Sequence, residues 1–531
     1  MTGADPSIRA TRALVPALMV VAFGLRYFAA TTVPMPWEEA RLVHEADAIS
    51  LSPGALKLPV HTMGRHLAGQ LYVAKLGTLL LGHNIAGFRF MSVVLGTASC
   101  WIVFALARRM WGAWPATLAL LLMCFNGFHI GVSRFAIERT YLFFSALAIY
   151  LFWRAVQEDR PRYMVMAGGV LGVGALVSEH TLLLLPAFGL YLALSGPHRP
   201  WLRRPAPYIG VLVAVAVCAP FVYLYLTDPD LRTQLGSDYA DHARRLGTLG
   251  LSYGPLTLYV PPLYYKLSGR VSEYPVMSLA GGLLLLGAVV WAHLVRRDAC
   301  TTLLLVVFWV FLGVFSLFTS DRPEFKWTAT SLFAAVPLGG AMLWALWRRW
   351  PAYGIAACLP LLYIGWFGCW VANRSYNAYY SPVVPPAAEH ISGPQFFHGV
   401  VTGAAGCYDF PSLVGSPMFP ARYRRYYLHH YVFVALLAHE GALSPALMRP
   451  ALERAARIDP DHPEVARLTA ALLRREAEDR QAGREYPLDG RQFFQDLGAL
   501  GRHGDRLSGT VILPPGVDIM DILKEPEPRA P

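Results

Sequence analysis

Two arginines lie in a short stretch between long apolar runs, in the order Ser133-Arg134-Phe135-Ala136-Ile137-Glu138-Arg139. A guanidinium fork binds a phosphate group well, and a lipid phosphate is the obvious anion at membrane level. The stretch can also be satisfied internally, because Glu138 lies four residues after Arg134 and could pair with it on a helix. The residues alone leave both interpretations open.

An acidic pair, Glu38 and Glu39, follows the first apolar run. Pro34 and Pro36 end that run and Trp37 suits a membrane interface, which places the two carboxylates at the membrane boundary. Charged groups at membrane depth often mark a functional site. They could equally form a solvated acidic start of a helix, where carboxylates are favoured.

Two further connections between apolar runs carry charge, with Glu179-His180 in one and Arg322 and Lys326 in the other. Each pair by itself could be a structural contact whose charges and hydrogen bonds are satisfied within the protein. Because these connections fall on the same side of the predicted bundle as Glu38 and Arg134, they suggest one polar cavity there. Carboxylates and histidines are available for a divalent metal, but no group has the spacing of a ligand set.

The elements that must position these residues are membrane helices. The chain has 531 residues, of which 55% are hydrophobic and only 15% charged, whereas soluble domains carry about 25% charged residues. Its apolar runs are about 20 residues long, enough to cross a hydrocarbon core of about 30 Å as helices. We therefore predict an all-α polytopic membrane protein with eleven helices, at 13–33, 88–107, 114–132, 140–156, 163–178, 181–195, 206–226, 276–295, 301–319, 327–347 and 352–371. The apolar segment 67–82 carries Gln70 and Lys75 and is expected to be interfacial or re-entrant.

The net charge of +11 comes from the connections on the N-terminal side of the membrane. These hold fourteen arginines and four acidic residues, while the rest of the chain is nearly balanced, with 32 basic and 31 acidic residues. The positive-inside rule places the arginine-rich side in the cytoplasm. The charge therefore indicates topology rather than a nucleic-acid partner, with a cytoplasmic N-terminus and an extracytoplasmic C-terminus in the inner (plasma) membrane.

The chain is expected to have two domains, a transmembrane domain at 1–371 with a first outer loop at 34–87, and an extracytoplasmic, mainly helical domain at 372–531. Within the second, amphipathic patterns at 424–440 and 444–458 precede Asp459-Pro460-Asp461-His462-Pro463. The segment 424–478 resembles part of a tetratricopeptide array. A plain helical hairpin fits the same pattern.

The order of these features resembles the GT-C glycosyltransferases of the protein O-mannosyltransferase and lipid A aminoarabinose transferase group, glycosyltransferase family 39. The acidic pair after the first helix corresponds to the family's Asp-Glu. The stretch Leu79-Leu80-Leu81-Gly82-His83-Asn84-Ile85-Ala86-Gly87-Phe88-Arg89 is similar to the family's L-F-G-x-N-x-x-A-x-R. Ser133-Arg134-Phe135 before the fourth helix, and Arg322 to Lys326 before a helix containing Pro337, agree as well. His66 falls where the family has a Lys/His-Pro-Pro motif.

This resemblance implies an enzyme that transfers a sugar from a polyprenyl-phosphate donor to a protein, glycan or lipid hydroxyl on the outer face, with inversion. It implies Glu38 as the general base with Glu39 next, and Arg134, Arg139 and Lys326 as ligands of the donor phosphate. Five further residues are candidates for the same cavity, namely His66, Glu138, Glu179, His180 and Arg322. No cofactor is required, because the lipid phosphate is itself a good leaving group.

Two other classes remain open. A lipid-linked sugar transporter or flippase would show an inverted repeat or paired broken helices in matching halves, and the sequence shows neither. A non-catalytic membrane scaffold with a partner-binding tail would account for altered motif positions, such as Glu38 where the family has Asp.

Overall fold

A computed structural model describes residues 6–32, 69–82, 85–136, 140–227, 256, 258–260, 277–295, 298–318, 325–373 and 448–481, with single positions at 428, 432, 435 and 439. Throughout these residues the regular structure is helical, as the sequence predicts. The chain forms two compact units. One contains Met1–Val33, Glu45–Gly82 and Ala86–Ser375, and the other contains Pro34–His44, His83–Ile85 and Tyr376–Pro531.

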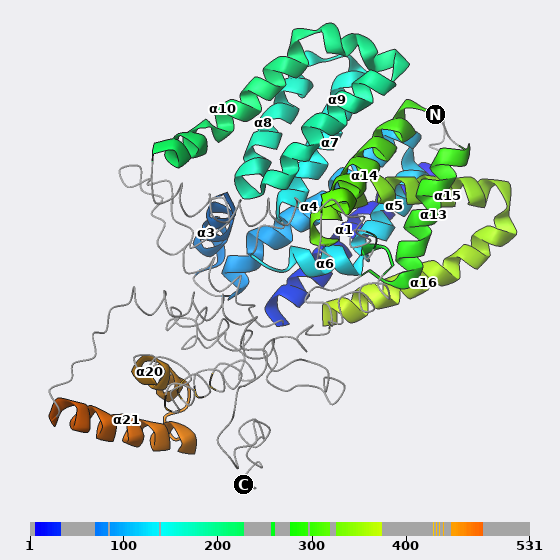
Figure 1. Ribbon diagram of the computed structural model, residues 1–531. Helices are drawn as coiled ribbons and strands as arrows, with labels where there is room; N and C mark the ends of the chain where they lie inside the picture. The colour runs from blue at the N-terminus through cyan, green and yellow to red at the C-terminus, as the bar shows by residue number, and fades with distance from the viewer. Residues whose placement is uncertain are drawn as a thin grey trace. The chain divides into compact units, whose positions relative to one another are not determined.

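The first unit is a bundle of helices (Figure 1). In chain order the α-helices and 3₁₀ segments (η) are α1 (Pro6–Thr32), α3 (Gly69–Leu81), α4 (Ile85–Trp111), α5 (Ala113–Cys124), α6 (Gly127–Ser133), α7 (Tyr141–Glu158), α8 (Pro161–Val177), η2 (Glu179–Leu183), α9 (Leu184–Leu194), η3 (Gly196–Arg203), α10 (Pro205–Thr227), α13 (Leu279–Val295), α14 (Ala299–Phe318), η5 (Phe325–Ser331), α15 (Leu332–Arg349) and α16 (Pro351–Asn373). Each of the eleven predicted runs falls on helical structure.

The run at 114–132 is two helices rather than the single one predicted. α5 and α6 meet at a bend of 62°. At the bend the Asn126 side chain accepts a hydrogen bond from the His129 backbone N–H at 2.9 Å and so caps α6. An Asn-Gly pair is a turn signal, and a side-chain cap replaces the helical bonds that a break removes.

A second bend of 117° separates the segment Glu179–Leu194 from η3. At its other end, the predicted run at 181–195 begins as the 3₁₀ segment η2 and becomes α-helical only at Leu184. Pro186 lies in the first turn of α9, where a missing backbone N–H removes no helical hydrogen bond.

Three helical stretches of the described chain are long and apolar enough to cross a membrane, at Ala86–Trp111, Ala299–Leu317 and Thr328–Arg349. The number rises to five if each bent pair is one span. The count of eleven spans therefore stays a prediction, although every run is helical. α3 has only 13 residues, which is shorter than a full crossing needs.

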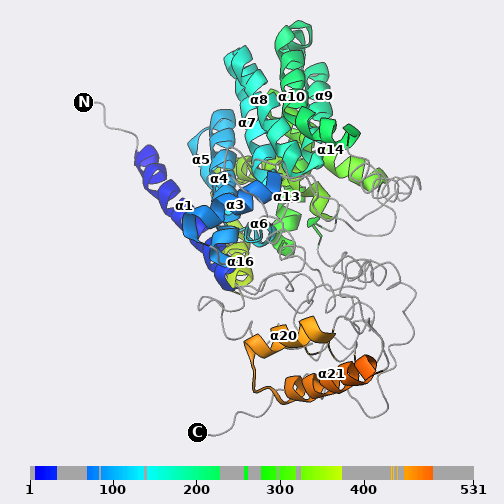
Figure 2. The same ribbon diagram turned by 90° about the vertical axis from the view of Figure 1, so that its left-hand side faces the viewer.

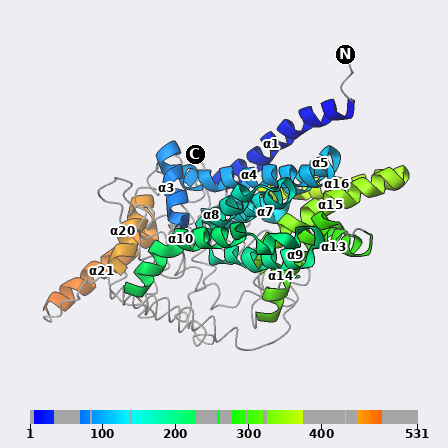
Figure 3. The ribbon, with the colours of Figure 1, turned by 90° about the horizontal axis from the view of Figure 1, so that it is seen from above.

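The bundle is held together by helix pairs that are close in the sequence. α8 packs against both α7 and α10 (Figure 2). α15 packs against α5, α13 and α16, so the last described helices of this unit join the first ones. Seen from above, α1 runs along one side of the bundle and α14 along the other (Figure 3).

Successive helices run in alternating directions, so the bundle has two ends. The Arg134 end, as we name it, holds the C-termini of α1 and α6 and the N-termini of α4 and α7. The Glu158 end holds the C-termini of α4 and α7 and the N-terminus of α8. Among the described candidate site residues, Arg134, Glu179 and His180 lie at the Arg134 end.

In the second unit, α20 (Met448–Ile458) and α21 (Pro463–Gln481) pack together. The Arg449 Nε donates a hydrogen bond to Glu476 Oε1 at 2.9 Å, and Ala455 and Leu468 are buried. The hydrogen bond to Glu476 raises the pKa of the Arg449 guanidinium above its usual value. α20 falls within the helical pattern predicted at 444–458, while 424–440 has only isolated described positions.

Candidate functional site

The Arg134 end contains two fully buried guanidinium groups on one aromatic ring. The guanidinium carbon of Arg134 lies 5.0 Å from the centroid of the Phe135 ring, and that of Arg89 lies 5.2 Å from the same centroid. Both arginines are 0% exposed. A cation over an aromatic face is stabilised by the ring quadrupole. The sequence predicts Arg134 as a site residue and quotes Arg89 only as part of a motif.

Arg89 also joins two helices at this end. Its Nη1 donates a hydrogen bond to the backbone carbonyl of Ala30, in the last turns of α1, at 2.6 Å. α1 therefore ends at a position fixed by α4. This matters for the candidate site because the predicted acidic pair follows α1 in the chain.

A polar contact links α3 to the start of α7. The Thr140 hydroxyl donates to the Gln70 side-chain oxygen, and both side chains are buried. The sequence treats Gln70 as a sign of an interfacial segment, whereas the structure shows a buried side chain with a buried partner. The signal that could have revealed this is an uncharged polar residue within an otherwise apolar run.

Glu179 and His180 lie in η2, at the same end of the bundle. His180 Nδ1 is 2.7 Å from Ser178 Oγ, and its ring lies near the rings of Tyr141 (6.1 Å) and Phe315 (5.6 Å). Glu179 is exposed. The structure thus places His180 among aromatic rings from α7 and α14 and Glu179 at the surface.

The remaining predicted site residues lie outside the described residues. These are Glu38, Glu39, His66, Glu138, Arg139 and Arg322. The backbone at Lys326 is described as part of η5, which packs against α7 and α14; its side chain is not described. The roles assigned to all seven therefore stay predictions.

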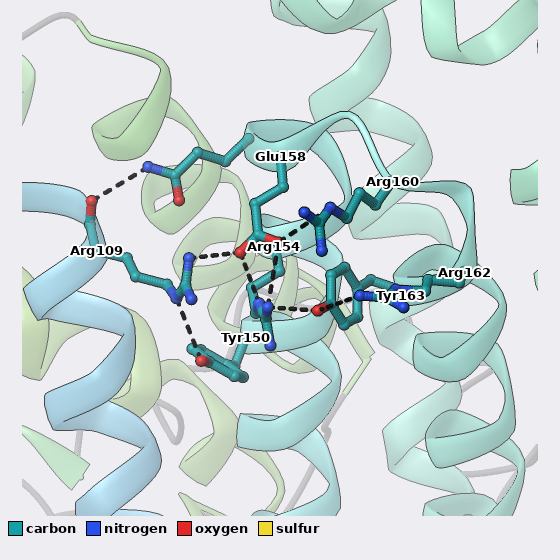
Figure 4. Close-up of polar contacts among 8 residues, drawn as sticks. Arg109, Tyr150, Arg154, Glu158, Arg160, Arg162 and Tyr163 are labelled. Atoms are coloured by element: carbon teal, nitrogen blue, oxygen red, sulfur yellow. Dashed lines mark hydrogen bonds and ion pairs between the residues drawn. The ribbon is translucent and has the colours of Figure 1, made fainter.

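The Glu158 end carries a cluster of opposite character, in which one carboxylate holds several arginines (Figure 4). Glu158 accepts hydrogen bonds from Arg154 (Nε, 2.8 Å) and Arg109 (Nη1, 2.6 Å), and Arg160 Nε lies 3.9 Å away. The hydrogen bond from Arg154, with the charges of its neighbours, lowers the pKa of Glu158. Arg109 also donates to the Tyr150 hydroxyl at 3.2 Å. The cluster ties α4, α7 and α8 together.

A polar network that the sequence analysis missed lies at the bend between α5 and α6. Arg26, in the C-terminal third of α1, is 0% exposed and donates to His129 Nδ1 at 2.8 Å. The signal was present in the sequence as one arginine within the first apolar run. Over the described part of the chain, no group of three or more histidine, cysteine or acidic side chains is arranged to hold a metal ion.

Comparison with known proteins supports the class that this helical membrane fold and its buried arginines suggest. Residues 69–224 match the family described as dolichyl-phosphate-mannose-protein mannosyltransferase. The matched segment contains Arg89, Arg134 and Phe135. This match supports the resemblance to GT-C glycosyltransferases, and the chain is a multi-pass membrane protein.

Particular relatives carry a more specific name. The chain is 28% identical over 293 residues to undecaprenyl phosphate-alpha-4-amino-4-deoxy-L-arabinose arabinosyl transferase 1 of Pseudomonas fluorescens (strain Pf0-1), covering 50% of this chain and 47% of the relative. It is 27% identical over 343 residues to transferase 2 of that name from another P. fluorescens strain, covering 61% and 56%. The chain thus matches about half the length of these relatives.

The chain is also similar in part to solved structures. ArnT from Cupriavidus metallidurans bound to undecaprenyl phosphate is 14% identical, with a TM-score of 0.49, over 88% of this chain and 78% of that one. The Archaeoglobus fulgidus oligosaccharyltransferase in the apo form is 12% identical, with a TM-score of 0.48, over 70% and 57%.

Proposed function

We propose that this protein transfers a sugar from a polyprenyl-phosphate donor to an acceptor hydroxyl on the extracytoplasmic face of the membrane, with inversion at the sugar carbon. The observation that carries the proposal is that the segment matching the mannosyltransferase family, 69–224, contains the buried pair Arg89 and Arg134. The names of the relatives, which specify an undecaprenyl-phosphate-linked aminosugar, support a lipid-linked donor.

The donor and the reaction both need cations near the headgroup level. As the sugar leaves, negative charge develops on the lipid phosphate, and preorganised donors aimed at that charge stabilise the transition state. Arg134, Arg139 and Lys326 are the proposed donors. Arg134 is buried and positioned by Phe135, so it would need little reorganisation.

The acceptor hydroxyl needs a general base, and Glu38 is the proposed one, with Glu39 beside it. The base removes the hydroxyl proton as the oxygen attacks the sugar carbon, and the bond to the phosphate oxygen breaks on the opposite face. The leaving group is polyprenyl phosphate, so the proposal requires no nucleotide or redox cofactor and leaves a divalent metal open.

The orientation belongs to the proposal as well. The Arg134 end would face the extracytoplasmic side, where the acceptor is, and the Glu158 end would face the cytoplasm. This assignment follows from the arginines of the connections at the Glu158 end and the positive-inside rule.

The test compares cells and purified protein with and without Glu38→Gln. Cells that express the wild type should show an added sugar mass on envelope glycans, lipids or glycoproteins by mass spectrometry. Purified wild-type protein should release free undecaprenyl phosphate from a lipid-linked donor only when the acceptor fraction is added. Glu38→Gln should lower that release by about 100-fold or more and still bind undecaprenyl phosphate.

Full turnover by Glu38→Gln would reject Glu38 as the base. Movement of the lipid-linked sugar across vesicles without release of undecaprenyl phosphate would instead support a flippase. A wild-type protein that shows neither sugar transfer nor transport, and that still binds partners through its tail, would support the scaffold.

A further inference from the structure

Arg26 connects the C-terminal third of α1 to the bend between α5 and α6. Its Nη2 donates to the Met123 carbonyl at 3.2 Å and to His129 Nδ1 at 2.8 Å, and its Nη1 donates to the Cys124 carbonyl at 3.4 Å. A fourth bond, from Nη1 to the Ala22 carbonyl at 2.9 Å, stays within α1. An arginine can only donate, so His129 Nδ1 must be the acceptor and the neutral ring carries its proton on Nε2.

These acceptors lie where a cation is favourable. Met123 and Cys124 are the last residues of α5, and helix C-termini carry partial negative charge on carbonyls that lack helical partners. The bend turns the chain away by 62° just after them. The Asn126 cap secures the start of α6, and the guanidinium of Arg26 secures the end of α5 and contacts the first turn of α6. The contacts from α1 thus hold α5 and α6 at a fixed angle to each other.

From His129 the contacts continue to Arg134. The Ser133 hydroxyl donates to the His129 carbonyl at 2.6 Å and fixes the last turn of α6. That turn lies tightly against α4, because a Cβ placed on Gly96 would come within 2.4 Å of Ser133 Cβ. Arg134 is the next residue, at the C-terminal cap of α6.

The contacts then return to α1. Arg134 shares the Phe135 ring with Arg89, and Arg89 donates to the Ala30 carbonyl, one helical turn beyond Arg26. Four residues separate the two points at which α1 is attached, and both attachments are buried. These contacts, which run from α1 through α6 and α4 and back to α1, therefore set where the Arg134 side chain can lie.

We propose that Arg26 is a positioning residue for the donor site: by fixing the angle between α5 and α6 from α1, it holds Arg134 where the lipid phosphate of the donor binds. This inference rests on the proposed function and adds to it a buried residue in the first apolar helix. Lysine cannot replace Arg26, because an ammonium group lacks the planar fork that reaches two carbonyls and a ring nitrogen at once.

The experiment measures the Kd of the full-length purified protein for undecaprenyl phosphate, by titration in detergent micelles. Arg26→Lys should raise the Kd about tenfold, the change that a displaced charge-assisted contact produces. Arg109→Lys is the matched control, a Lys substitution of an arginine at the Glu158 end, and should change the Kd less than about twofold. Melting temperatures of the variants check that each one is folded.

A double-mutant cycle with Arg134→Lys separates positioning from a general structural role. If Arg26 acts through Arg134, the two substitutions together should raise the Kd no more than Arg134→Lys alone. If the Arg26 variant does not fold, Ser133→Ala replaces it, since it loosens the same turn of α6 with a small change of volume.

Each outcome decides one claim. A folded Arg26→Lys variant with an unchanged Kd, or fully additive effects in the cycle, would overturn the positioning role while leaving the proposed function intact. A wild-type protein that does not bind undecaprenyl phosphate would instead count against the proposed function itself.

Discussion

Arginines at the two ends of the bundle have different partners, and the partners decide what each can do. Arg89 and Arg134 lie against an aromatic ring, and Arg89 also against a backbone carbonyl. Arg109 and Arg154 instead share the carboxylate of Glu158. A guanidinium that is paired with a carboxylate is neutralised by it, and a cation that lies over an aromatic ring is stabilised by the ring quadrupole. The proposal that a lipid phosphate binds at the Arg134 end rests on these two buried cations.

At Glu158 the stability of the protein should depend on pH. Its hydrogen bonds from Arg154 favour the ionised form and lower its pKa below the usual 4.5 in the folded protein. The carboxylate therefore contributes its full stabilisation above the pKa of the unfolded chain and loses it as the pH falls through the folded value. Glu158→Gln should lower the melting temperature at pH 7 by about 2 °C and flatten its dependence on pH below about 5.

The control for this prediction is Glu464→Gln. Glu464 pairs with Arg467 three residues along an exposed part of α21, where an ion pair contributes little. Thermal unfolding followed by circular dichroism from pH 3 to pH 8 measures both variants. An acid-induced loss of stability as steep in Glu158→Gln as in the wild type would rule out the role of Glu158.

Between helices, the closest packing is that of α8 on α10, and it depends on small residues. A Cβ on Gly168 would lie 2.0 Å from the Gly210 carbonyl oxygen, and one on Gly172 would lie 2.9 Å from the Ala214 oxygen. The two helices thus present small residues four positions apart to each other, a pattern that lets backbones approach closely inside a membrane.

Gly168→Ala should therefore destabilise the protein, by about 1–3 kcal/mol, because the new methyl group meets backbone that cannot move aside. Gly169→Ala is the matched control on the next residue, where a Cβ would meet only Val213 Cγ1 at 3.6 Å. That substitution should be neutral or stabilising, since alanine favours a helix by up to about 1 kcal/mol over glycine. Unfolding midpoints in denaturant compare the two, and equal midpoints would show that α8 and α10 do not pack this closely.

The bends show where prediction at this scale stops. Each of the eleven predicted apolar runs falls on helical structure, because burial in lipid or protein selects long apolar stretches whatever their neighbours are. At the break after Cys124, the Met123 and Cys124 carbonyls accept hydrogen bonds from Arg26, which is about a hundred residues away in the chain. A periodicity measured within one run carries no information about such a partner.

At the scale of the whole molecule, the alternation of helices separates Glu158 and its arginines from Arg134. The positive-inside rule then predicts which end faces the cytoplasm. Alkaline phosphatase fused after residue 400 should be active, since that position is predicted to lie outside the cytoplasm. The same reporter fused after Arg204, in the connection after η3, should be inactive. Activity in the second fusion and none in the first would reverse the orientation.

The sequence by itself determined the helical class, the helices of the bundle and the acidic and basic residues worth testing, because apolar length and the order of motifs are local properties of the chain. Only the tertiary structure decided that Arg89 joins Arg134 on Phe135, that Gln70 faces Thr140, and that Arg26 holds the bend between α5 and α6. These contacts connect residues that are far apart in the chain. Burial inside the bundle makes an unsatisfied polar group costly, and this cost selects their partners from among neighbours that only the fold brings together.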